Sequence, residues 1–334
     1  MDEKFEEIIK KCQKYLENIP TIIIGSGFSV PFGLPSMWAL GEEIKTKLNS
    51  KYSSEEAWIS FIEFLDSTQN LELAMHKAPL TPNMYSDIIR VTWELINSKD
   101  KEVFSNIMNQ TEGTVLSKIF YKLLQSHPRK VKVITANYDR LVEYSVDKIS
   151  ANIETGFQGE CTKQFTGLQK SNELKENTVL LCKVHGSLDW FKNERSLQLV
   201  SMPNSFKIYD GFTPAIVTPG IQKYQETHNE PYRSLIATAD EFISSALSFL
   251  CIGYGFNDEH LQPKLIDHIQ QRSKPAVIVT KKLSDKAKEI LENAKKYIVF
   301  EEDSSGKTKI TVDGVVEVVD GDYWQLDKFI ELWL

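Results

Sequence analysis

The sequence is poor in cysteine and has no long apolar run. Its four cysteines, Cys12, Cys161, Cys182 and Cys251, are widely spaced, which fits neither a zinc knuckle nor the disulfide framework of a small secreted protein. We therefore expect reduced thiols in a cytoplasmic protein. No stretch approaches the roughly 20 apolar residues that cross a bilayer, and the N-terminal segment lacks the apolar core of a signal peptide, so no membrane partner is expected.

An excess of basic residues is also missing. The 334 residues include 39 Lys and Arg against 46 Asp and Glu, a formal net charge of −7. Proteins that bind nucleic acid need clustered positive charge to contact phosphates. The composition thus argues against direct nucleic-acid binding, while 41% hydrophobic residues can build a sizeable core.

Short apolar runs bounded by polar or turn residues predict strands along much of the chain. They lie at 21–24, 131–135, 179–184, 215–217, 247–253 and 276–280. Amphipathic helical patterns follow two of them, at 139–149 and 258–269. Because buried strands that alternate with helices form parallel sheets covered on both faces, we predict a doubly wound, mostly parallel α/β fold.

Other segments depart from this alternation. Residues 52–126 read as helices with no strand between them, which predicts a helical insertion covering the sheet. The N-terminal segment predicts an amphipathic helix, and 301–309 is the stretch most like a linker. The C-terminal run 321–334 is rich in aromatic and aliphatic residues and should be buried, either on its own domain or in an oligomer or partner contact.

The first predicted strand ends in the turn Gly25-Ser26-Gly27, and a helix is predicted from Pro35. Glycines allow a sharp turn close to a ligand, and a helix N-terminus offers N–H groups to an anion such as a pyrophosphate. The segment lacks the full dinucleotide-binding spacing and the lysine of a P-loop. A plain structural turn remains an equal alternative.

Three further stretches place polar residues at the ends of predicted strands, where open α/β sheets bind ligands. They are TANYD (135–139), VHGSLDW (184–190) and GYGFNDEH (253–260). Each has a structural alternative: Asn137 as a helix cap, His185 as a turn histidine, and Gly253 and Gly255 as points of bending.

Taken in order, the four stretches resemble the sirtuins. GSGFSVPFGLP (25–35) is similar to the family's Gly-Ala-Gly-x-Ser with Gly-x-Pro, TANYDRL (135–141) is similar to Thr-Gln-Asn-x-Asp-x-Leu, HGSL (185–188) carries the family's catalytic histidine, and GYGFND (253–258) falls at its late nucleotide loop. The resemblance implies a Rossmann-like fold, NAD as substrate, and a single NAD-binding domain over 1–334 with the helical insertion at 52–126.

The sequence also departs from the zinc-containing deacylases of that family. Their two cysteine pairs are absent between Trp190 and Pro214, and Ser36, Met37 and Trp38 stand where many of them have an arginine after Gly-x-Pro. No zinc module is expected, and the scattered histidines suggest no other metal. The chain therefore looks more like the bacterial sirtuin-like NAD hydrolases of anti-phage defence.

The resemblance and the chemistry of the nicotinamide–ribose bond together suggest residue roles. Asn137 would orient the ribose or a water, Asp139 would accept from the carboxamide, and His185 would be the base. The phosphates would meet backbone N–H groups of the first motif, and Asn257 or Asp258 would bond a hydroxyl of the adenosine half. The expected NAD-binding residues are Gly25, Ser26, Gly27, Phe28, Ser29, Gly33, Pro35, Gly253, Gly255 and Asn257.

We thus expect an NAD hydrolase that releases nicotinamide and yields ADP-ribose or a cyclic form of it. An NAD-dependent protein deacylase or ADP-ribosyltransferase is one alternative, and a non-catalytic sensor of NAD or ADP-ribose is another. An enzyme that destroys NAD would poison its own cell. We therefore expect control by homo-oligomer assembly, by a separate regulatory or sensor protein, or by both.

Overall fold

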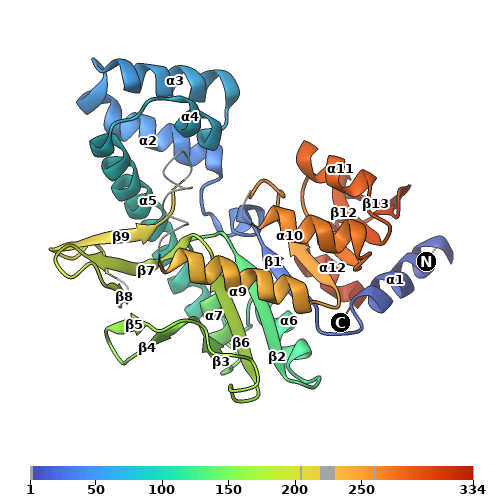
Figure 1. Ribbon diagram of the computed structural model, residues 1–334. Coiled ribbons are helices and arrows are strands. Elements are labelled where there is room, and N and C mark those ends of the chain that lie inside the picture. Colours follow the sequence, from blue (N-terminus) through green and yellow to red (C-terminus); the bar gives the residue numbers. More distant parts are fainter. Residues whose placement is uncertain (1–2, 204, 219–229, 259–260, 334) are drawn as a thin grey trace.

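The structure is a computed structural model that describes residues 3–203, 205–218, 230–258 and 261–333 (Figure 1). Within these ranges no helix is both long enough and apolar enough to cross a membrane.

A nine-stranded sheet forms the centre of the molecule, in the order β14-β13-β12-β11-β10-β1-β2-β6-β3. Its strands are β1 (Thr21–Ile24), β2 (Lys130–Thr135), β3 (Asn152–Glu154), β6 (Thr178–Lys183), β10 (Phe249–Ile252), β11 (Ala276–Val279), β12 (Tyr297–Ser304), β13 (Lys307–Val312) and β14 (Val315–Asp320). The run from β3 to β12 is parallel, and β13 and β14 add an antiparallel edge. This confirms the predicted mostly parallel sheet.

Both faces of this sheet are covered, as the continuous apolar strands predict. Ile22 and Ile24 of β1 point into one core with α1 (Glu3–Tyr15), α6 (Val115–Leu123), α7 (Leu141–Asp147) and α12 (Leu326–Trp333). Ile23 points into the opposite core with α9 (Tyr232–Ser245), α10 (Gln262–Ile266) and α11 (Asp285–Glu292). Alternate residues of one strand therefore serve two helical layers.

A second, antiparallel sheet has the order β4-β5-β8-β7-β9. Its strands are β4 (Phe157–Gln158), β5 (Lys163–Phe165), β7 (Gly186–Asn193), β8 (Leu199–Ser201) and β9 (Phe212–Ile216). The apolar run at 215–217 was expected in the parallel sheet, and this expectation is wrong. The chain bends after His185, and β9 pairs antiparallel with β7. A short apolar run does not by itself reveal which sheet will bury it.

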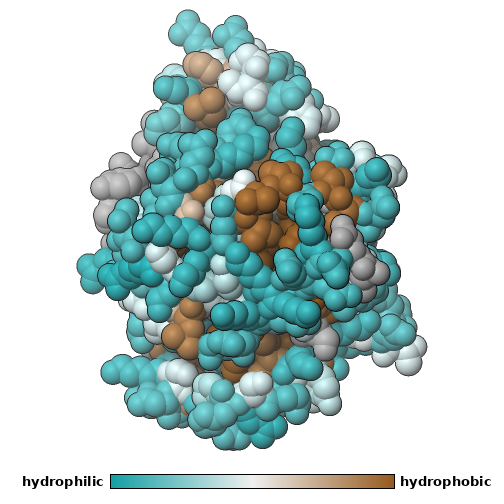
Figure 2. Space-filling view, turned by 90° about the vertical axis from the view of Figure 1, so that its right-hand side faces the viewer, coloured by the Kyte–Doolittle hydropathy of each residue, from teal (hydrophilic) through white to brown (hydrophobic). Residues whose placement is uncertain are grey.

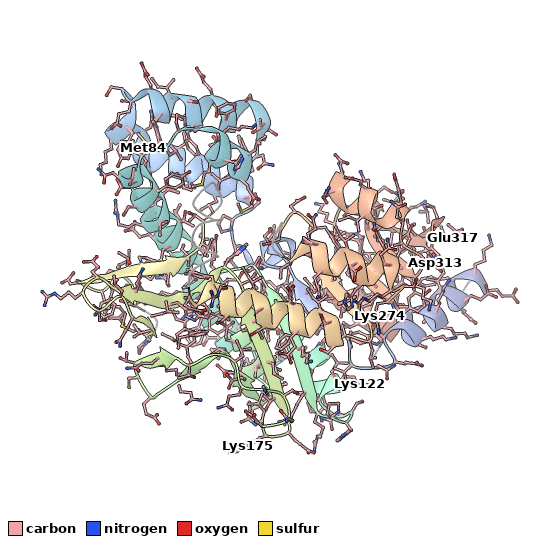
Figure 3. The ribbon with its side chains drawn as sticks, in the orientation of Figure 1. Met84, Lys122, Lys175, Lys274, Asp313 and Glu317 are labelled. Atoms are coloured by element: carbon pink, nitrogen blue, oxygen red, sulfur yellow. The ribbon has the colours of Figure 1, made fainter. Side chains whose placement is uncertain are left out.

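The predicted helical insertion is present and begins earlier than residue 52. It comprises α2 (Met37–Tyr52), α3 (Glu56–Thr68), α4 (Leu71–Lys77), α5 (Pro82–Asn109) and α6. Figure 1 shows α2, α3, α4 and the start of α5 standing together beside the large sheet, and we call this part the helical lobe. Trp58, Phe61 and Met84 are fully buried within it, and Figure 3 labels Met84 in this lobe. Of the insertion's helices, α6 packs against β2.

The segment 301–309 is not a linker. It forms a hairpin between β12 and β13. Glu301 on β12 is buried and forms an ion pair with Lys309 on β13, with 2.8 Å between Oε1 and Nζ. Its polar sequence misled the prediction because the charged side chains neutralise each other within the sheet.

The aromatic C-terminus packs on its own chain. Phe329 of α12 is buried against Phe300 of β12, with ring centroids 5.2 Å apart. The neighbouring α1 is tied to the antiparallel edge by Lys4 with Glu317 at 3.2 Å and Lys11 with Asp313 at 2.6 Å. Figure 3 labels Glu317 and Asp313 at this edge. The edge strand β14 exposes Val315, Val316 and Val318, and Figure 2 shows apolar patches on this side of the molecule.

Candidate active site

The candidate site lies where the chain changes direction across the sheet. From β1 the chain continues to β2 on one side, and the later β10 pairs with β1 on the other. In such folds the carboxyl ends of the strands beside this switch point leave a crevice for ligands. The predicted motifs at 25–35, 135–141, 185–188 and 253–258 all follow strands or bends at this end.

The first and last motifs pack directly on each other. Gly25 N–H donates to Ile252 O at 3.0 Å, and Gly27 N–H donates to Gly253 O at 3.1 Å. A Cβ at Gly25 would lie 2.5 Å from Gly253 O, and a Cβ at Gly253, where φ is +56°, would lie 2.3 Å from Phe28 N. These glycines are therefore needed for contact between two protein loops.

This packing changes the expected role of the first motif. The N–H groups of Gly27, Phe28 and Ser29 donate to Gly253, Gly25 and Ser26 carbonyls respectively, in addition to the Gly25 bond above. In the described part of the chain the N–H groups of Ser26 and Val30 in this motif have no protein acceptor. The expectation that the backbone of GSGFS meets phosphates is therefore wrong for its other N–H groups, because the carbonyls of Ile252 and Gly253 and the 3₁₀ turn at Ser26–Phe28 use those donors.

Asn137 follows the end of β2 and links two motifs. Its Nδ2 donates to Gly25 O and to Ser29 Oγ, both at 3.0 Å. The Asn137 side chain does not cap α7, since Leu141 N–H at the start of that helix donates to Asp139 Oδ1 at 3.2 Å. Both amide hydrogens are used inside the protein, so Asn137 can reach a ligand only through Oδ1, as an acceptor.

Asp139 is buried below the same loop. Its Oδ2 accepts from Ser29 Oγ at 2.7 Å, and its Oδ1 accepts from Leu141 N–H. Burial raises the pKa of Asp139, while the positive charge of Lys183 and the bond from Ser29 oppose this shift. Each carboxylate oxygen keeps a second lone pair, and the residue lines the cavity described below.

A buried lysine holds the Asn137 loop from beneath. Lys183, the last residue of β6, donates through Nζ to Asp139 O, to Tyr138 O at 3.4 Å and to Glu143 Oε1 at 3.0 Å. Its side chain is 1% exposed. Burial raises the pKa of Glu143 to about 7, and Lys183 limits the rise. One cation thus fixes the backbone that presents Asn137.

His185 lies at the bend between β6 and β7. Gly186 makes this bend possible, since its φ is +84° and a Cβ there would lie 2.0 Å from Ala215 O. The ring of His185 is buried, and its Nε2 lies 3.0 Å from Oδ2 of Asp258. The sequence placed Asp258 with the adenosine half, so its contact with His185 is a new assignment.

The late glycine-rich loop supplies another polar group. Burial, followed by the charge of Asp258, raises the pKa of Tyr254 well above its ordinary value. The Tyr254 hydroxyl has no hydrogen-bond partner among the described residues and borders the cavity. A polar ligand that accepts a hydrogen bond would fit this position.

The motifs meet around a cavity of about 220 Å³. The expected residues that line it are Gly25, Ser26, Ser29, Pro35, Asn137, Asp139, His185, Gly255, Asn257 and Asp258. Gly27, Phe28, Gly33 and Gly253 are not part of this lining. The residues that the sequence did not single out are Leu34, Met37, Leu40, Glu72, Ile96, Ala136, Tyr138, Val217 and Tyr254.

Four of these additional residues come from the helical insertion. Met37 and Leu40 lie on α2, Glu72 lies in the first turn of α4 and Ile96 lies on α5, so the insertion forms a wall of the cavity. Their local sequences are those of ordinary amphipathic helices. No sequence signal could have identified them, because only the tertiary packing brings them to the strand ends.

Comparison with known proteins assigns the family. Residues 131–300, about half of the chain, match the family model described as SIR2-like domain. The chain belongs to this SIR2-like family. Sirtuin-like proteins use NAD as a substrate, and the chain is accordingly an NAD-utilising enzyme with the sirtuin-type fold. No curated protein sequence matches it.

Several solved structures are similar. A structure from work on the mechanism and regulation of Sir2 enzymes has 13% identity and a TM-score of 0.48 over 99% of this chain and 97% of its own. A mutant Sir2 homologue in complex with ADP-ribose has 12% identity and a TM-score of 0.47, covering 89% and 90%. Sir2 bound to an acetylated peptide has 15% identity and a TM-score of 0.42, covering 89% and 92%.

The cysteines contribute no metal centre within the described ranges. Cys12, Cys182 and Cys251 are buried apart from one another, and Cys161 is exposed. Among the described residues no group of three His, Cys, Asp or Glu side chains could hold a metal ion. The segment after His185 forms β7, β8 and β9, and its sequence from Gly186 to Ile216 contains no cysteine.

Proposed function

We propose that the chain is an NAD glycohydrolase that cleaves the nicotinamide–ribose bond and releases ADP-ribose or a cyclic form of it. The observation that carries the proposal is the meeting of Asn137 and His185 at one cavity beside the switch point of the sheet. Membership in the SIR2-like family supports NAD as the ligand. The missing cysteine pairs favour hydrolysis over deacylation.

The proposed reaction needs no general acid. When the bond between the ribose anomeric carbon and the nicotinamide nitrogen breaks, the electron pair returns to the cationic ring and nicotinamide leaves as a neutral molecule. The sugar becomes oxocarbenium-like. The oxygen of a water, or a hydroxyl of the same molecule in the cyclic case, then bonds to that carbon and its proton passes to His185.

The hydrogen bonds of Asn137 define its part in this scheme. Because Nδ2 is held by Gly25 and Ser29, the remaining Oδ1 would accept from a ribose hydroxyl or from the attacking water. Asp139 would accept from the nicotinamide carboxamide through its second lone pairs. The Ser26 N–H and hydroxyl are the groups of the first motif proposed to meet a phosphate.

The biological setting is proposed from the resemblance alone. Similar bacterial enzymes act in anti-phage defence, and destruction of NAD in the cytoplasm calls for restraint. We infer a regulated effector, built as one domain over 1–334, that is controlled by homo-oligomer assembly, a separate sensor protein or both.

The test uses the full chain, incubated with NAD alone and under assembly-promoting conditions, with products separated by chromatography. Release of nicotinamide with ADP-ribose or its cyclic form is expected, and Asn137→Ala should abolish most of it. The exposed Asn172→Ala is the matched control. NAD-dependent removal of acyl groups from lysine peptides without hydrolysis would move the chain to the deacylases, and NAD binding without turnover would make it a sensor.

A further inference from the structure

A buried carboxylate lies against the ring of His185. Oδ2 of Asp258 is 3.0 Å from Nε2 of His185, and the two side chains are 6% and 8% exposed. They come from separate parts of the fold, since His185 follows β6 and Asp258 ends the loop after β10. The contact therefore depends on the closure of the loops around the switch point.

The surroundings of Asp258 hold its carboxylate in place. Its Oδ1 accepts from Leu261 N–H at 3.4 Å, and its carbonyl accepts from Gln262 N–H at 2.9 Å. The same loop is anchored by Gln262 Nε2, which donates to Phe256 O. An anchored carboxylate can fix the orientation of a partner ring, whereas a mobile surface carboxylate would not.

We propose that Asp258 is a positioning residue: its carboxylate lies 3.0 Å from Nε2 of His185, not aligned for a hydrogen bond in this structure, and by its charge favours the tautomer of the base that carries its hydrogen on Nε2. This rests on the proposed role of His185. A neutral imidazole carries one N–H and one lone pair, so a ring that carries its hydrogen on Nε2 presents its lone pair at Nδ1. A proton leaving water or a ribose hydroxyl would be taken at Nδ1, and the resulting imidazolium would be paired with the Asp258 carboxylate.

The competing explanation is purely structural. Asp258 precedes the short α10, and its bond to Leu261 N–H could be its whole purpose. The two roles are separated by Asp258→Asn, because an asparagine oxygen still accepts from Leu261 while its NH₂ group meets Nε2. An amide donor at that position favours the opposite tautomer of His185.

The first measurement does not require turnover. Long-range proton–nitrogen NMR of the full chain, with the His185 signals assigned from His185→Gln, reports which ring nitrogen carries the hydrogen. We expect the Nε2–H form in the unaltered protein and its loss in Asp258→Asn. A wild-type ring in the Nδ1–H form would overturn the proposal, whether or not the variant folds.

The second measurement compares kcat and KM for NAD. Asp258→Asn should lower kcat at least ~10-fold with little change in KM or in the thermal midpoint, as expected for a residue that acts through the base. The exposed Asp285→Asn removes the same charge elsewhere and should leave both constants unchanged. A raised KM with normal kcat would assign Asp258 to substrate binding and refute the positioning role.

The two proposals can fail separately. If the unaltered protein releases no nicotinamide under any condition while Asp258 still sets the tautomer, the glycohydrolase assignment fails and the ring contact stands. If nicotinamide is released and Asp258→Asn changes neither tautomer nor kcat, the positioning role fails alone.

Discussion

At the scale of single residues, His185 is the first to test. Removal of the imidazole in His185→Ala should lower turnover by ~10²-fold or more, because the attacking oxygen loses its proton acceptor. NAD affinity should change less, and the thermal midpoint should move little. Nicotinamide release and calorimetry with NAD provide the readouts, with the exposed His76→Ala as control. Near-normal turnover would remove His185 from the mechanism.

The glycine corner leads to a different expectation at Gly27. A Cβ there would lie 2.9 Å from Gly253 O, so even Gly27→Ala must push the two loops apart. Overpacking of this kind costs about 1–3 kcal/mol of unfolding free energy. Urea denaturation should detect this loss, and NAD affinity should fall with it. Full stability combined with lost affinity would instead place the Cβ against the ligand.

Single residues also show what could be predicted from the sequence. Asn137 and His185 were identified because short motifs fix them at strand ends, and the structure brings both to the cavity. The backbone role of Gly27 was misjudged, since a sequence cannot tell whether a glycine faces a ligand or another loop. The partner of His185 was not assigned, because Asp258 reaches it only through tertiary closure.

At the scale of elements, the loop after β2 depends on Lys183 of β6. Lys183→Met would leave two carbonyls and Glu143 without their buried donor, which should cost about 3–5 kcal/mol of unfolding free energy. Turnover should fall as well, because the backbone that carries Asn137 loses its support. Thermal denaturation and nicotinamide release test this expectation. The double variant Lys183→Met with Glu143→Leu should recover part of the stability, and failure to recover any would argue against the ion pair.

The same pair predicts a pH effect at α7. Folding raises the pKa of Glu143 from 4.5 to about 7, so the folded chain binds more protons than the unfolded chain between these values. Because the folded state binds this proton more tightly, protonation of Glu143 raises the free energy of unfolding. This contribution is fully present below about pH 4.5 and is lost as pH rises through about 7. Relative to Glu143→Gln, the unaltered protein should lose about 2–3 kcal/mol between pH 5 and pH 8.

Urea denaturation at both pH values provides the measurement. The exposed Glu173→Gln serves as control and should follow the pH dependence of the unaltered protein. If the free energy of unfolding of Glu143→Gln changed with pH in the same way as that of the unaltered protein, Glu143 would have an ordinary pKa in the folded state.

Some helices and strands could be predicted from their sequences better than others. Fully buried strands such as β1 and β11 were predicted, since continuous apolar runs need two covering layers. The hairpin of β12 and β13 was mistaken for a linker because its charges pair across the strands. The helices of the insertion were predicted as helices, while their position beside the cavity depends on long-range packing that local periodicity does not encode.

At the scale of the whole molecule, the C-terminal helix stabilises the chain that carries it. Phe329→Ala should cost about 3–5 kcal/mol of unfolding free energy, because a buried ring is lost beside Phe300. The oligomeric size should not change, since α12 packs on its own sheet. Denaturation and light scattering measure the two quantities. A variant that keeps its stability but changes its oligomeric size would assign α12 to an interface.

The contact between the first and last motifs also has a consequence in time. A ribosome makes Gly27 more than 200 residues before Gly253 and Asp258, so the corner cannot close on a growing chain until synthesis has passed Asp258. We expect a nascent chain that ends at Ser245, held on the ribosome, to leave NAD intact. Cleavage by such a chain would contradict this expectation. If a chain of this length is inactive, the order of synthesis delays the proposed NAD cleavage until Asp258 has been made.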